Sequence, residues 1–234
     1  MSLQVTLNPY MRSLGAQHTA GLTAVEAVLI ASITFDQLND DVYGYVQPAY
    51  YTSPDLFTVN ELKSILPFAM NSYLDPSLKG YNGTQMGIIG KLLNSIVSGD
   101  VQYDSIPDFL LEIEDGISKS GLTFEEQAPL YMATAVGKAD YDYWGSAGGN
   151  WVSKGYLNTS GYALQNNIPH YMQAAMYGAL CMGNQAETFG LIDPPKIIGV
   201  NMVTALYASI GLAAGKVIFK WIPRVGEAGC NCGH

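Results

Sequence analysis

The last five residues of the chain bring together side chains that bind soft metals. Cys230, Cys232 and His234 occupy alternate positions in the ending GEAGCNCGH. Thiolate and imidazole groups suit Cu and Zn, and two close thiols can also exchange disulfides. A structural zinc site usually separates its cysteines by about two to four residues and draws ligands from two segments. The sequence therefore offers a Cu or Zn site or a thiol-handling pair, against the alternative of a flexible end without specific chemistry.

The remaining histidines and the third cysteine lie beside apolar residues. His18 follows Leu14 by about one helical turn, which indicates a core or helix-end histidine that hydrogen-bonds to the backbone. His170 follows Pro169 in an expected first turn, where the helix dipole lowers the pKa of an imidazole. Cys181 is eleven positions from His170, about three turns along one helix, so these two side chains cannot form a catalytic pair. The sequence leaves any catalytic residue unknown.

Two groups of acidic residues could form negatively charged patches. They are Glu112, Glu114 and Asp115, and Asp36, Asp40 and Asp41. Neither has the Glu-x-x-His spacing of a di-iron bundle, and the calcium-loop pattern is absent. The chain also lacks a G-x-S-x-G motif, a phosphate-binding loop and a dinucleotide fingerprint. The motifs therefore favour a protein that is not an enzyme.

The composition favours contact with other proteins. Charged residues make up 13% of the 234 residues, against roughly 25% in typical soluble domains. There are 16 tyrosines, whose apolar ring and polar tip suit surfaces that a partner covers in part. The net charge of −9 and the lack of a basic stripe argue against nucleic-acid binding. The expected partner is a second copy of the chain or another protein.

Helix start and stop signals recur along the chain. Thr23–Glu26, Thr58–Glu61 and Thr123–Glu126 each place Glu three residues after Thr, the spacing of a capping box. Pro169 is expected in a first turn, and the glycines from 145 to 149 are expected to end a helix. The periodic segments predict eight helices, at 9–18, 24–39, 58–74, 84–98, 106–118, 124–144, 169–182 and 195–221.

These elements predict one all-α domain, a multi-helix bundle over 1–223, followed by a flexible Cys/His tail over 224–234. Residues 41–52 are expected to form either a short hairpin or an aromatic loop. Three cysteines cannot provide a disulfide framework, so the redox compartment stays open. No secretory signal is evident at the start of the chain, which leaves a cytoplasmic protein or export by a non-classical route.

The stretch from Ile197 to Gly215 contains no charged residue. Its apolar residues surround the whole circumference of a helix, so it suits either the central helix of the bundle or a membrane span. Asn201, Thr204 and Ser209 favour a protein interior.

Two stretches resemble a known group of proteins. The opening Asn8-Pro9-Tyr10, with Gly15 and His18 at fixed distances after it, resembles the start of a loose group of uncharacterised bacterial proteins, many of them exported. The stretch from Ala128-Pro129-Leu130-Tyr131-Met132-Ala133 to Tyr143-Trp144 resembles a later helix of that group. The resemblance implies no activity and no catalytic residue.

The sequence as a whole favours a non-enzymatic helical binding or assembly protein that self-associates or acts at a cell surface. One alternative is a soft-metal or thiol-handling protein acting through Cys230, Cys232 and His234. A second is a membrane-active protein that inserts the 195–221 helix.

Overall fold

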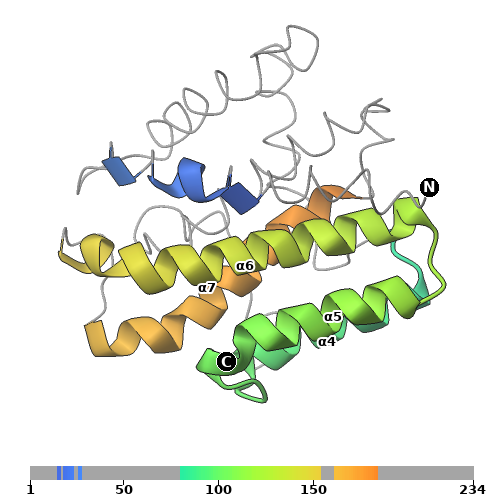
Figure 1. Ribbon diagram of the computed structural model, residues 1–234, viewed down its shortest axis with the longest axis horizontal. Coiled ribbons are helices and arrows are strands. Elements are labelled where there is room, and N and C mark those ends of the chain that lie inside the picture. The colour runs from blue at the N-terminus through green and yellow to red at the C-terminus, as the bar shows by residue number, and fades with distance from the viewer. Residues whose placement is uncertain (1–14, 17, 24–25, 28–79, 154–160, 184–234) are drawn as a thin grey trace, which may run out of the picture.

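The computed structural model describes residues 15–16, 18–23, 26–27, 80–153 and 161–183, and this part of the chain is helical with no strand (Figure 1). The all-α class is therefore confirmed for the described residues. The predicted helices at 58–74 and 195–221, most of those at 9–18 and 24–39, the 41–52 segment and the 224–234 tail lie outside this part.

Helix α4 spans Gly83–Val97, within one residue of the prediction at each end. Asn82 caps it, because its side chain accepts a hydrogen bond from the Gln85 backbone while the Gln85 side chain accepts one from the Asn82 backbone. Such reciprocal bonds satisfy two of the amides that a helix start leaves free. The chain turns away after the helix at Gly99, whose φ of 82° lies in the left-handed region that favours glycine.

The short 3₁₀ helix η1 (Tyr103–Ser105) leads into α5, which spans Ile106–Lys119 as predicted to within one residue. Pro107 lies in the first turn of α5, where its missing N–H costs no intrahelical bond. One face of α5 is buried and consists of Ile106, Phe109, Leu110, Ile113 and Ile117. These positions recur at helical spacing, so burial of this face explains the helix.

Helix α6 spans Phe124–Ser153, nine residues beyond the predicted end at 144. Its start is as expected, since Thr123 and Glu126 form the capping box through both hydrogen bonds. The glycines from 145 to 149 do not end the helix, so that prediction is wrong. Trp144 and Trp151 are fully buried on either side of these glycines. Removal of a buried tryptophan costs about 3–5 kcal/mol, which exceeds the roughly 1 kcal/mol that one helical glycine costs.

Helix α7 spans Gly161–Gly183, so it begins eight residues before the predicted start at 169. Pro169 lies inside the helix and does not open it. An interior proline removes one backbone hydrogen bond and costs about 3 kcal/mol. Leu164 and Ile168, which precede the proline, are both buried, and this burial favours extending the helix through it.

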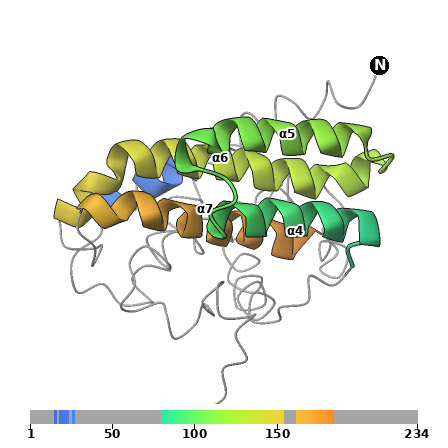
Figure 2. The ribbon, with the colours of Figure 1, turned by 90° about the horizontal axis from the view of Figure 1, so that it is seen from below.

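The four long helices of the described part pack along one another. The α6–α7 pairing is the most extensive, α5 packs on α6, and α4 contacts α5, α6 and α7. Figure 2 shows α5 and α6 next to each other, with α4 and α7 below them. Helix α6 contacts α4, α5 and α7, so its buried residues occur on several sides.

The described residues between 15 and 27 are also helical, and Figure 1 shows them beside α6. Gly21 lies within this helical stretch and does not end it. The expected capping box at Thr23 is wrong, because the Thr23 hydroxyl donates to the carbonyl of Thr19 one turn earlier. Glu26 instead contacts α6.

Candidate functional site

A histidine and an aspartate that are 122 positions apart meet in the interior. The Nε2 atom of His18 lies 2.7 Å from Oδ1 of Asp140, and neither side chain is exposed. The sequence interpretation placed His18 in the core, which is correct, but expected a backbone partner where the structure has a carboxylate. In a neutral imidazole whose Nε2 donates to Asp140, the other nitrogen, Nδ1, carries a lone pair. That atom is buried and has no hydrogen-bond partner among the described residues.

A second buried polar group lies next to this pair. The Tyr143 hydroxyl is 3.0 Å from Oε2 of Glu26 and 3.3 Å from the carbonyl of Leu22, and its single proton can donate to one of them at a time. The Trp151 indole donates to the same hydroxyl at 2.7 Å. Tyr143 is three residues after Asp140 on α6, so the two groups lie on one face of that helix.

The electrostatics keep Tyr143 neutral. Burial raises the pKa of the Tyr143 phenol, the hydrogen bond from Trp151 opposes the shift, and the Glu26 carboxylate adds to it. A neutral phenol can donate to Glu26 and accept from Trp151 together. These hydrogen bonds link the 15–27 segment to α6. They replace the hydrogen bonds that the same polar groups would form with water if they were exposed.

Small residues allow this close approach. Gly15 lies against α6, where a Cβ atom would come within 3.2 Å of the Ala135 carbonyl and 3.5 Å of the Ala139 side chain. Three contacts follow one another along the two elements. Gly15 lies against Ala135, His18 contacts Asp140, and the Leu22 carbonyl lies near the Tyr143 hydroxyl. The 15–27 segment and α6 therefore run in the same direction. We call these contacts the buried polar seam.

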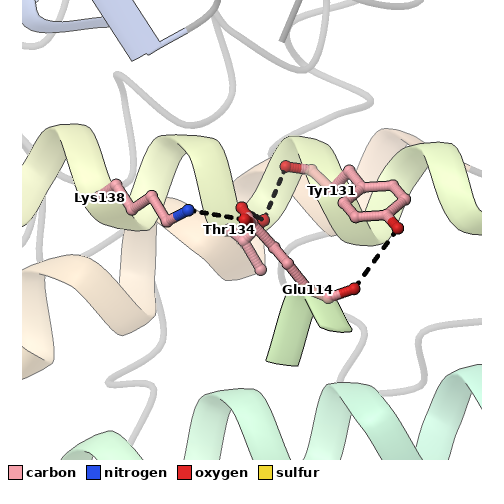
Figure 3. A network of polar contacts seen from close by, with 4 residues as sticks. All are labelled: Glu114, Tyr131, Thr134 and Lys138. Carbon is pink, nitrogen blue, oxygen red and sulfur yellow. Dashed lines mark hydrogen bonds and ion pairs between the residues drawn. The ribbon is translucent and has the colours of Figure 1, made fainter. Parts of the chain in front are cut away.

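The predicted acidic patch on α5 is divided among separate partners. Glu114 accepts from the Lys138 ammonium at 2.7 Å and the Thr134 hydroxyl at 2.9 Å, and its own carbonyl lies 3.4 Å from the Tyr131 hydroxyl (Figure 3). Thr134 is also within reach of the Tyr131 carbonyl at 2.9 Å. This network joins α5 to α6.

The other two members of that acidic patch pair elsewhere. Glu112 pairs with Lys91 of α4, and Asp115 pairs with Lys119 one turn along α5. Among the described residues, no group of three or more His, Cys, Asp or Glu side chains could hold a metal ion. The three carboxylates of this patch therefore contact three separate lysines.

The surface beside η1 carries a different group of residues. The rings of Tyr103 and Tyr141 pack with centroids 4.9 Å apart and planes tilted by 34°. Both tyrosines are partly buried, whereas Asp104 and Asp142 next to them are exposed. Burial, then the neighbouring Tyr141, then Asp104 raise the pKa of Tyr103 to about 12, and burial followed by Asp104 raises the pKa of Tyr141. We call these four residues the tyrosine–aspartate face.

The remaining site predictions have mixed outcomes. His170 lies in the interior of α7 and not in a first turn, so the helix-dipole explanation is wrong; partial burial lowers the pKa of His170. Cys181 shares α7 with His170 as predicted. Its side chain lies outside the described part, and so do Cys230, Cys232 and His234, and Asp36, Asp40 and Asp41. No helix in the described ranges is long and apolar enough to cross a membrane, and the Ile197–Gly215 stretch falls outside those ranges.

The sequence patterns did not identify Asp140 as the partner of His18. Asp140 follows Val136 and Gly137 at helical spacing, so it continues the apolar face of α6. A carboxylate on such a face indicates a buried partner, and that signal was available in the sequence. Which histidine or lysine would supply it was not, because the partner lies more than a hundred residues away.

Comparison with protein-family models, with curated proteins and with solved structures finds no match to this chain.

Proposed function

We propose that this chain is a non-enzymatic helical binding and assembly protein that self-associates. The observation that supports it is the tyrosine–aspartate face, where two aromatic rings already pack on each other at the surface. Aromatic side chains are enriched at protein interfaces, and ordering them before binding lowers the entropy that association costs. The packed pair of Tyr103 and Tyr141 has this property.

The proposal extends the expected architecture beyond the described helices. We place α4 to α7 in a bundle of eight helices, with the charge-free part of the 195–221 segment, Ile197 to Gly215, at its centre. The charge-free stretch from Ile197 to Gly215 supports this, because burial inside a bundle is one way to remove such a segment from water. We also propose that the chain is related to the group of bacterial proteins that it resembles. That group has no activity that could be assigned to this chain.

Sedimentation velocity from micromolar to millimolar concentration tests self-association. We expect the average mass to rise with concentration, and replacement of both Tyr103 and Tyr141 by Ser to weaken that rise. Leu111→Ser is the matched control, because Leu111 is 55% exposed on α5 and its loss also removes apolar surface. A protein that stays monomeric throughout contradicts the proposal. Loss of association in the Leu111 variant alone would place the interface on α5.

A further inference from the structure

The described helices carry a strong excess of negative charge. The described residues contain three lysines against eleven aspartates and glutamates, whereas the whole chain has 11 basic and 20 acidic residues. Most of the net charge of −9 therefore lies on the described part of the chain. Such a surface attracts cationic groups and repels other acidic surfaces.

Each described lysine is already paired with a carboxylate. The pairs are Lys91 with Glu112 at 2.6 Å, Lys119 with Asp115 at 2.7 Å and Lys138 with Glu114 at 2.7 Å. None of these lysines pairs with Asp104 or Asp142, which are exposed and have no ion-pair partner within the described ranges. The tyrosine–aspartate face thus lacks a positive charge of its own.

The geometry of this face suits a cation that also has an apolar stem. A guanidinium or ammonium group is attracted to the face of a tyrosine ring, and an arginine can at the same time form hydrogen bonds to a carboxylate. Tyr103 and Tyr141 supply the rings, and Asp104 and Asp142 supply the carboxylates beside them. Gly145 is exposed next to the Tyr103 hydroxyl, where a Cβ atom would come within 3.1 Å, so its lack of a side chain leaves the edge of the rings open.

The chain itself contains a segment with the complementary charge. Residues 194–226 include Lys196, Lys216, Lys220 and Arg224 and no aspartate or glutamate. The last three of these cations are spaced by four residues, with Phe219 and Trp221 among them. A cationic and aromatic segment is the chemistry that an acidic tyrosine surface recognises.

We propose that the tyrosine–aspartate face of one copy binds the cationic segment from Lys216 to Arg224 of a second copy. This inference rests on the proposed function, because it names the two surfaces through which the chain would self-associate. The contact is heterologous, since each copy offers a different surface to its neighbour, and such contacts build rings or open chains of copies.

Reversal of charge on both surfaces tests the pairing. We expect D104K/D142K to weaken self-association by about tenfold or more, and K220E/R224E to do the same. An equimolar mixture of the two variants should associate again, because each then offers the surface that the other needs. Wild-type association should also weaken as salt concentration rises, since the charges are exposed. Sedimentation velocity measures all four samples.

The control changes the same charge at other places. E112K/E125K alters two exposed carboxylates outside the face and should leave association within about twofold of wild type. Circular dichroism checks that every variant keeps its helix content. A wild type that is monomeric at all concentrations overturns both this inference and the proposed function. A wild type that associates while the face variants match the control overturns this inference alone, and so does a mixture that fails to associate again.

Discussion

At the scale of single residues, the most informative feature is the contact between His18 and Asp140. A buried carboxylate without a partner would be costly, and the imidazole at 2.7 Å supplies one. Such a pair contributes less to stability than its short distance suggests, because both groups have lost their contact with water. Breaking it costs more, since the remaining side chain stays buried after losing this contact.

We predict that His18→Ala and Asp140→Ala each lower the free energy of unfolding by about 3–5 kcal/mol. The double variant should lose less than the sum, with a coupling energy of about 0.5–3 kcal/mol, because the second substitution removes a group already left without its partner. Urea unfolding of the wild type, the two single variants and the double variant measures this coupling energy as a double-mutant cycle. Strict additivity would show that the two side chains do not interact in solution. Glu112→Ala, at an exposed ion pair, should cost no more than about 1 kcal/mol.

A second residue-scale prediction concerns acid and His170. Partial burial lowers the pKa of His170 below its usual 6.5, so the unfolded chain binds this proton at a higher pH than the folded chain does. Well above pH 6.5 His170 is neutral in both states and does not reduce the free energy of unfolding. That free energy falls as the pH drops below 6.5, because the unfolded chain binds the proton more readily. Urea unfolding at about pH 7.5 and about pH 5.5 should show a smaller loss in His170→Gln than in the wild type. Equal losses in both proteins would remove His170 as the cause.

At the scale of elements, local signals located helix starts well when they involved the backbone of the helix itself. The Thr123–Glu126 capping box begins α6 as expected, and Pro107 begins α5. The same signals failed where tertiary burial was stronger. Pro169 and the glycines from 145 to 149 would interrupt an isolated helix, but each lies next to residues that must be buried against another helix.

Glycines within these helices should respond in opposite ways to alanine. At Gly137 a Cβ atom would lie 2.5 Å from the Met176 sulfur of α7, so Gly137→Ala should force the α6–α7 contact apart and cost about 1–3 kcal/mol. At Gly87, an exposed position, nothing lies within 4 Å of such an atom, so Gly87→Ala should stabilise α4 by about 0.5–1 kcal/mol. Thermal unfolding of both variants checks this. Stabilisation by both would mean that Met176 moves aside at no cost.

At the scale of the whole molecule, the separation of charge along the chain is the main result. The described helices are acidic, whereas residues 194–226 are cationic and free of acidic groups. Low overall charge and many tyrosines already indicated a protein that contacts other proteins. The structure adds which carboxylates are already paired with lysines and which are exposed without such a partner in the described part.

The sequence alone determined the all-α class of the described part and the positions of α4 and α5, because these depend on residues close together in the chain. Amphipathic spacing and capping act within a few turns, so they can be recognised without knowing the fold. The last residue of α6 and the first residue of α7 could not be predicted in this way, since burial of Trp151 and Leu164 outweighed the local signals.

Only the tertiary structure decided which polar groups meet. His18 and Asp140 are 122 positions apart, and Glu26 and Tyr143 are 117 apart. The sequence shows that each is polar and that Asp140 lies on an apolar helical face, but long-range pairing depends on how helices pack. Packing is set by the fit of entire faces, such as Gly15 against Ala135 and Ala139, and no short pattern encodes it.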